Sequence, residues 1–169
     1  MPMVASNTDR NQTAFTVSVD VLDGTTSGAS AYDRARTARR LAQPEAVAKD
    51  FSRPGHLFPL IARDGGVLER PGHTEASVDL CLLAGLEPVA VIGELMRNDG
   101  TMMRLGECRD FAAQHSLKLI NVEQIIRYRQ GSPTCALPLG NADEGRPRPT
   151  AVSVDHVQLV EVRRAGIHV

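Results

Sequence analysis

The chain is organised around residues 53–80, which read RPGHLFPLIARDGGVLERPGHTEASVDL. The apolar run at 57–62 has the length of a β-strand, and the Asp-Gly-Gly step at 64–66 supplies a tight turn because glycine accepts positive φ at little cost. Thr74 is placed to cap a helix that follows, since a threonine side chain can accept a hydrogen bond from the first helical N–H groups. The stretch therefore predicts a strand, a turn and a helix.

Two Gly-His steps punctuate this stretch, at Gly55-His56 and at Gly72-His73. The predicted bend delivers Arg70, His73 and Thr74 to the N-terminus of the helix. A helix N-terminus attracts anions through its free N–H groups and its dipole. These side chains therefore suit a phosphorylated substrate or a metal-bound oxyanion.

On the N-terminal side, Thr13–Val21 alternates apolar and polar residues, which predicts a half-buried strand. A small-residue loop, Asp23–Gly28, follows as a weak phosphate-cradle pattern, and most such loops are simply turns. Ser30 then begins a helix that is expected to run to about Ala42, with Asp33 completing an approximate capping box.

On the C-terminal side, strands continue to alternate with helices, and the first strand carries Glu94 at its end. This order predicts the fold class α/β (an α+β sandwich), a mixed sheet covered by helices. The expected elements are a buried strand Pro88–Leu95, a turn at 98–100, a helix Glu107–His115, a strand Leu117–Val122 and a helix Val122–Arg129.

Composition predicts one soluble domain of ordinary kind. The 169 residues carry 19 basic and 20 acidic side chains, a net charge of −1, so the charge gives no indication of binding to nucleic acid or to an anionic membrane. No apolar run approaches the roughly 20 residues that cross a bilayer. The three cysteines are widely spaced, which argues against a disulfide framework and a zinc site. We expect a cytoplasmic protein with a globular domain at 1–130, a Pro/Gly-rich linker at 131–150 and a C-terminal strand and tail at 151–169.

Three motifs together resemble 3,4-dihydroxy-2-butanone 4-phosphate synthase, an enzyme family of riboflavin biosynthesis. They are RPGHLFPL at 53–60, GGVLERPGHTEASVDL at 65–80 and AVIGELMRNDGTMMRLGEC at 90–108. The resemblance covers about Met3 to Arg129, and long motifs in the right order are far more specific than one short pattern. It implies a Mg²⁺-dependent lyase that converts D-ribulose 5-phosphate into 3,4-dihydroxy-2-butanone 4-phosphate and formate.

The resemblance also implies roles for particular residues. His73 falls on the family's Mg²⁺-ligand histidine, and Mg²⁺ (or Mn²⁺) needs further oxygen ligands beside one imidazole. His56 and Glu94 match residues required for activity and are the candidates for proton transfer. The residues that match substrate-contacting positions are Arg70, Gly72, His73, Thr74, Glu94 and, in the small-residue loop, Ser27.

Each of these residues also has a plain structural interpretation. A histidine after a glycine is more often structural or solvated than a ligand, and Arg70 alone would be taken for a solvated surface residue. Glu94 is equally compatible with an edge-strand carboxylate in water. Glu75 and Asp79, on the predicted helix, are expected to be solvated or salt-bridged.

One part of the family pattern is absent from this sequence, an acidic Arg-Glu-Asn-Glu-Gly-Asp-type loop whose first glutamate bridges the metals. Three hypotheses stay open: an active synthase-type lyase, a shortened relative with altered chemistry on a related substrate, and a non-catalytic partner of a complete synthase. We expect a homodimer, a second chain able to supply the acidic loop, weak Mg²⁺ binding, retained sugar-phosphate binding, and formate release that is slow or undetectable from the chain alone.

Overall fold

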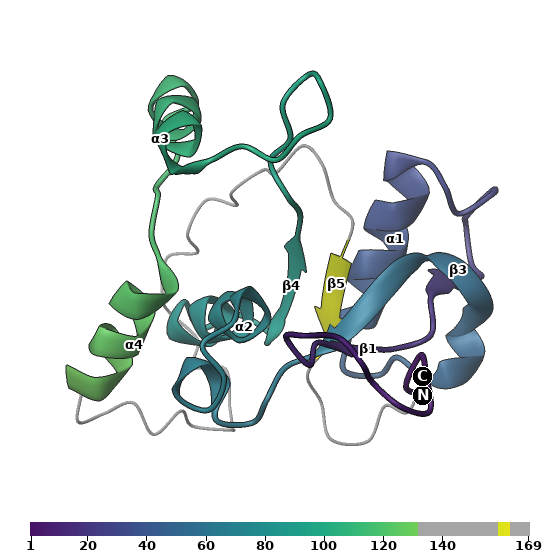
Figure 1. Ribbon diagram of the computed structural model, residues 1–169. Helices are drawn as coiled ribbons and strands as arrows, with labels where there is room; N and C mark the ends of the chain where they lie inside the picture. Colours follow the sequence, from purple (N-terminus) through teal and green to yellow (C-terminus); the bar gives the residue numbers. More distant parts are fainter. Residues whose placement is uncertain (132–158, 163–169) are drawn as a thin grey trace.

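The long strand β3, Phe51–Ile61, is the element around which the other strands assemble (Figure 1). The computed structural model describes residues 1–131 and 159–162. Besides β3, the strands are β1 (Ala14–Phe15), β2 (Val19–Val21), β4 (Val89–Ile92) and β5 (Leu159–Val162). The helices are α1 (Ala31–Leu41), α2 (His73–Leu83), α3 (Leu105–Gln114) and α4 (Val122–Gly131), with short 3₁₀ turns η1 (Ala48–Asp50) and η2 (Gly66–Leu68).

The sheet is mixed, as the sequence predicts. Strand β3 pairs antiparallel with β1 and with β2, and parallel with β5. Strand β4 pairs antiparallel with the other edge of β5, so that the order is β1-β3-β5-β4. The observed fold, a mixed sheet with helices packed against it, confirms the expected α+β class.

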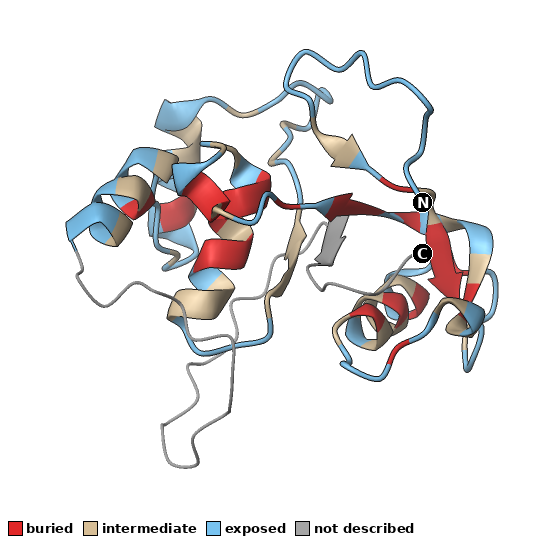
Figure 2. Cartoon of the chain, turned by 90° about the horizontal axis from the view of Figure 1, so that it is seen from below, coloured by how far each residue is buried: buried red, intermediate tan, exposed pale blue. Residues whose placement is uncertain are grey.

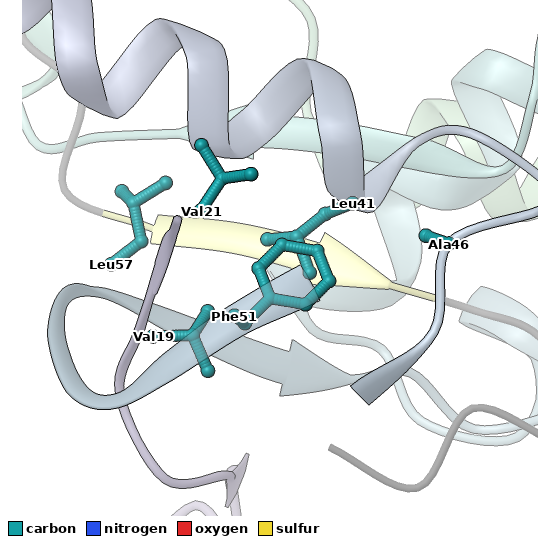
Figure 3. Close-up of a cluster of buried hydrophobic side chains, with 6 residues drawn as sticks. All are labelled: Val19, Val21, Leu41, Ala46, Phe51 and Leu57. Carbon is teal, nitrogen blue, oxygen red and sulfur yellow. The ribbon is translucent and has the colours of Figure 1, made fainter. Parts of the chain in front are cut away.

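Helix α1 covers a first apolar core beside β2 and β3. Ser30 caps this helix, because its hydroxyl accepts a hydrogen bond from the N–H of Asp33 at 3.1 Å, as the sequence predicts. Leu57 is fully buried in this core. Figure 3 shows its six buried side chains, which come from β2, the end of α1, the loop that follows α1, and β3: Val19, Val21, Leu41, Ala46, Phe51 and Leu57.

A second core joins α2 to α4 and η2, and Figure 2 shows the buried face of α2 there. Its apolar centre consists of Val67, Ala76 and Ile125. Beside it, Arg129 Nη1 lies 2.8 Å from Asp79 Oδ2. The Asp79 side chain is 0% exposed, so it is salt-bridged in the interior rather than solvated.

The predicted strand Thr13–Val21 is wrong as a single element. Val17 and Ser18 interrupt it, because the segment advances by four residues from Phe15 to Val19 while its partner β3 moves by only three, from Leu60 to Leu57. All three residues of β2 are buried, so the expected alternation of buried and exposed positions does not hold there.

The predicted strand Leu117–Val122 is also wrong, because this segment leads irregularly into α4. The backbone N–H of Asn121 donates to the side-chain oxygen of Gln124, and the backbone N–H of Gln124 donates to the side-chain oxygen of Asn121. This reciprocal pair is a capping box, which stabilises the N-terminus of a helix. The apolar residues Leu119 and Ile120 are exposed and have no sheet to cover. The predicted turn at 98–100 and the helices α3 and α4 are confirmed.

The expected linker at 131–150 lies almost wholly outside the described residues. Of the predicted strand Ala151–Val162, the structure describes Leu159–Val162, and that part is the strand β5. Among the described residues, no helix is long and apolar enough to cross a membrane.

Candidate active site

His56 on β3 and Asp20 on β2 form a hydrogen-bonded pair. His56 Nδ1 lies 2.6 Å from Asp20 Oδ2, and the backbone N–H of His56 donates to Asp20 Oδ1 at 2.9 Å. The Asp20 side chain is 10% exposed, whereas the imidazole is 43% exposed. The pair therefore joins a buried carboxylate to an imidazole that a substrate can reach.

A bulge in β3 presents His56 to Asp20. Val19 pairs with Leu57, but the next residue, Asp20, pairs with Ser52, so β2 advances by one residue while β3 advances by 57 − 52 = 5. The residues left between the two pairs include Gly55 and His56. A Cβ on Gly55 would lie 2.0 Å from the carbonyl carbon of Val19, so only glycine permits this approach of the two strands.

The small-residue loop before α1 closes over the His56–Asp20 pair. Gly28 has φ +82°, and a Cβ there would lie 2.0 Å from Asp20 Oδ2 and 2.8 Å from His56 Nδ1. Ser27, the predicted substrate contact, is exposed next to Gly28. The loop that was expected to cradle phosphate therefore lies against the candidate proton-transfer histidine.

Asp33 on α1 holds this loop in place. Its carboxylate accepts hydrogen bonds from the hydroxyl of Thr26 at 2.9 Å and from the N–H of Gly28 at 3.1 Å. Burial works to raise the pKa of the Asp33 carboxyl, but the hydrogen bonds from Thr26, Gly28 and Ser30 outweigh it and lower the pKa below its ordinary value. Asp33 is therefore an ionised anchor for the loop at neutral pH.

Arg70 is held by structural contacts rather than left in solvent. Its Nη1 lies 2.6 Å from Glu75 Oε2, and its Nε and Nη2 donate to the carbonyl of Asn11. The Glu75 side chain is 1% exposed, so the solvated interpretation of this glutamate is wrong and the salt-bridged one is confirmed. A Cβ on Gly72 would lie 2.4 Å from Arg70 Nη1, which explains a glycine beside this ion pair.

Helix α2 begins two residues earlier than expected, at His73 rather than at the residue after Thr74. Its N-cap is Gly72, which offers no side chain to the first helical N–H groups, and the predicted cap Thr74 lies inside the first turn and is buried. His73 is the first helical residue and is exposed. The helix N-terminus thus carries uncapped N–H groups next to an accessible imidazole.

The predicted buried strand Pro88–Leu95 is shorter and only half-buried in the structure, since β4 ends at Ile92, and Glu94 follows it in an exposed position. The chain then turns back on itself, with Met103 N–H donating to the carbonyl of Leu95 and Arg97 N–H donating to the carbonyl of Thr101. Glu94 therefore lies between the sheet and this small hairpin.

The structure brings some of the predicted residues together. It joins His56 to the Gly28 loop and joins Arg70 to Gly72. Glu94 follows β4, a strand that packs against the helix beginning at His73. The sequence reasoning missed Asp20 as the partner of His56. Asp20 occupies a polar position of a predicted half-exposed strand, so only its place beside the small-residue loop could have drawn attention to it.

The described residues do not form a complete metal site. Within residues 1–131 and 159–162, no group of three or more His, Cys, Asp and Glu side chains could hold a metal ion. Both oxygens of Asp20 lie within hydrogen-bond distance of His56 nitrogens, and Asp9 accepts a hydrogen bond from the N–H of Thr13. Within the described residues, neither carboxylate completes such a group with His73.

Comparison with known proteins places this geometry in a family. The family model for 3,4-dihydroxy-2-butanone 4-phosphate synthase matches residues 1–128. The chain is 53% identical over 130 residues to the 3,4-dihydroxy-2-butanone 4-phosphate synthase of Saccharomyces cerevisiae, which covers 76% of this chain and 62% of that protein. It is 53% identical over 133 residues to the riboflavin biosynthesis protein RibBA of Bacillus cytotoxicus, covering 79% of this chain and 33% of that protein.

A solved structure agrees with the sequence matches. The crystal structure of a 3,4-dihydroxy-2-butanone 4-phosphate synthase in complex with two magnesium ions superposes with a TM-score of 0.68 at 44% identity, covering 77% of this chain and 66% of that chain. The chain thus spans less than two thirds of the length of the two curated relatives named above. The chain belongs to the 3,4-dihydroxy-2-butanone 4-phosphate synthase family.

Proposed function

We propose that this protein is a lyase of riboflavin biosynthesis that converts D-ribulose 5-phosphate into 3,4-dihydroxy-2-butanone 4-phosphate and formate. The observation that carries the proposal is the accessible His56 imidazole, held by buried Asp20 within a chain 53% identical to a synthase of that name. Enolisation of a sugar phosphate needs a base within reach of a carbon-bound proton. His56 and the exposed Glu94 supply the two groups that can move protons.

Substrate binding is assigned to the residues around the two glycine-rich turns. The uncapped N–H groups of α2, with His73 and Thr74 in its first turn, suit the negative charge of a phosphate or an enediolate. Arg70 acts from a guanidinium that Glu75 and Asn11 already hold in place, which reduces the entropy lost on binding. Gly72 allows that close packing, and Ser27 offers a hydroxyl beside His56.

A divalent cation, Mg²⁺ or Mn²⁺, would supply Lewis-acid stabilisation of negative charge on the substrate's vicinal oxygens. The described residues offer it one protein ligand, His73, so they do not by themselves fit a closed Mg²⁺ site. We therefore propose that the cation binds weakly without substrate. No step assigned here to His56 or Glu94 depends on it.

We further propose a cytoplasmic homodimer. Several large apolar side chains are exposed, among them Leu80, Leu86, Leu105 and Tyr128, and such surfaces are commonly covered by association. A second chain that supplies the acidic loop is a further partner compatible with a shared site. Light scattering at micromolar concentration tests the dimer, and a monodisperse monomer would contradict it.

Formate release from ribulose 5-phosphate tests the activity. Purified protein is assayed with Mg²⁺, alone and with a complete synthase in which the residues matching His56 and Glu94 have been replaced. Formate in either assay, lost when this chain carries His56→Gln, supports the lyase. Sugar-phosphate binding without formate in both assays would instead favour a relative with altered chemistry. Stimulation of an intact synthase by the His56→Gln variant would favour a non-catalytic partner.

A further inference from the structure

We propose that Asp20 is the positioning residue for His56: it holds the imidazole as the tautomer protonated at Nδ1 and so presents Nε2 as the basic nitrogen. This role rests on the proton-transfer role of His56 proposed above. Its structural part, the tautomer, can be measured without any turnover.

The hydrogen bonds leave one arrangement of protons when Asp20 is ionised and the His56 imidazole is neutral. An ionised carboxylate only accepts hydrogen bonds, so the 2.6 Å contact between Asp20 Oδ2 and His56 Nδ1 requires the proton on Nδ1. A neutral imidazole carries one proton, so Nε2 keeps its lone pair. The nitrogen that faces away from the buried carboxylate is thereby the one able to take a proton from a substrate.

The carboxylate cannot turn away from this contact. Its other oxygen, Oδ1, accepts the backbone N–H of His56 at 2.9 Å, so the histidine holds the aspartate at two points. The side chain is 10% exposed, and Gly28 closes over Oδ2 so tightly that a Cβ there would lie 2.0 Å away. Asp20 is thus fixed in direction by its partner and by the loop above it.

The same carboxylate stabilises the state that follows proton transfer. Once Nε2 takes a proton, the ring becomes an imidazolium and the Nδ1–H donates to Asp20 as a charge-assisted hydrogen bond. The buried, ionised Asp20 therefore fixes the tautomer of His56 before proton transfer and stabilises its positive charge afterwards. Asp20 acts in this step through its hydrogen bond to His56, which makes it a positioning residue.

The Asp20→Asn variant tests this role because asparagine has nearly the same shape as aspartate but carries an NH₂ donor in place of one acceptor oxygen. The amide has one acceptor oxygen, which the backbone N–H of His56 requires, so its NH₂ group is turned toward Nδ1. Nδ1 must then accept, and the proton moves to Nε2. Asp110→Asn is the matched control, since Asp110 is exposed on α3.

The measurement is ¹⁵N NMR of the histidine rings in the full chain, with pH raised until the rings are neutral. His56→Gln assigns the His56 signals among the five histidines. We expect protonated Nδ1 in the parent and in Asp110→Asn, and protonated Nε2 in Asp20→Asn. Thermal unfolding of each variant confirms that it is folded. A parent His56 protonated at Nε2, or an unchanged tautomer in Asp20→Asn, would overturn the proposal.

Kinetics provides the second readout. Asp20→Asn should lower kcat for formate release by about 10²- to 10⁴-fold, the contribution of one general base, with KM changed only a few-fold. An unchanged kcat in a variant whose tautomer has reversed would also overturn the role. Absence of formate release by the parent, both alone and with the complete synthase described above, would instead refute the lyase activity, and the observed tautomer reversal would leave the Asp20–His56 arrangement standing.

Discussion

Arg70 and Glu75 form an ion pair at the start of helix α2, with Nη1 and Oε2 2.6 Å apart and the glutamate side chain 1% exposed. The same guanidinium donates to the carbonyl of Asn11, so it joins the N-terminal segment to the helix. Glu75 also accepts the N–H of Arg63 at 3.1 Å. The arginine expected to contact substrate therefore has a structural partner inside the protein.

Replacing Arg70 with methionine should destabilise the protein by about 3–5 kcal/mol, because Glu75 would be left as an unpaired buried charge. Urea unfolding measures this change. Arg63→Met is the control, since the Arg63 side chain is exposed and only its backbone N–H contacts Glu75. A loss below about 1 kcal/mol in Arg70→Met, the range of surface ion pairs, would show that the pair is not buried in solution.

Gly55→Ala should destabilise the protein by about 1–3 kcal/mol, the usual cost of forcing an atom into a packed interior. The added Cβ would meet the backbone of Val19 at 2.0 Å, and backbone atoms cannot move aside as a flexible side chain can. Gly106→Ala is the matched control, because a Cβ at Gly106 meets nothing within 4 Å. Because alanine is more favourable than glycine inside a helix, Gly106→Ala in α3 should raise the free energy of unfolding by up to about 1 kcal/mol.

Thermal unfolding of the two alanine variants distinguishes packing from backbone flexibility. Equal shifts in Tm for Gly55→Ala and Gly106→Ala would contradict the close approach of β2 and β3. The ¹⁵N tautomer of His56 in Gly55→Ala would then show whether the bulge is needed to seat the imidazole on Asp20.

Acid should loosen helix α3. Hydrogen bonds from the Arg97 side chain and the Arg104 backbone N–H lower the pKa of Glu107 from 4.5 to about 2. A carboxyl whose pKa is depressed in the folded state stabilises the protein above its unfolded pKa and loses this effect as pH falls through the folded value. The contribution of Glu107 is therefore present at neutral pH and lost between about pH 5 and pH 2.

The dependence of Tm on pH measures this contribution. In Glu107→Gln the decline of Tm below pH 5 should be shallower than in the parent. Glu123→Gln removes the same charge from an exposed pair with Arg127 on α4 and serves as the control. Parallel pH curves for the parent and Glu107→Gln would refute the ion pair with Arg97.

Much of the fold could be predicted because local signals agreed with tertiary structure. The Ser30 cap, the turn at 98–100 and the strand before Glu94 are set by residues close in sequence. The segment Leu117–Val122 has an apolar pattern like a strand, but none of the described strands pairs with it, and the reciprocal Asn121–Gln124 hydrogen bonds start a helix instead. Strand pairing is a long-range property that the local pattern does not contain.

Motifs predicted the candidate site residues, but they did not predict the side chains that hold these residues in place. His56, His73 and Glu94 stand in recognisable runs, whereas Asp20 meets His56 only through a bulge that shifts the pairing of β2 and β3. Glu75 was expected to be solvated or salt-bridged, and its burial depends on Arg70 folding back over Gly72. Such contacts follow from the packing of distant segments rather than from periodicity.

His73 is expected to bind metal only together with substrate. One neutral imidazole offers no charge to offset the reluctance of Mg²⁺ to release its waters, so calorimetry should show no saturable Mg²⁺ binding until ribulose 5-phosphate is present. His73→Ala should abolish this substrate-linked binding. His115→Ala, at an exposed histidine after α3, is the control. Tight Mg²⁺ binding by the parent without sugar would reveal further ligands beyond His73.

The most direct test follows uniformly ¹³C-labelled ribulose 5-phosphate by NMR in the presence of Mg²⁺ and the parent protein, which reads binding and formate formation in one sample. We expect the sugar signals to change on binding, and we expect labelled formate to accumulate slowly with the parent and not with His56→Gln. Sugar signals that never change with protein concentration, or formate that accumulates equally with both proteins, would contradict this expectation.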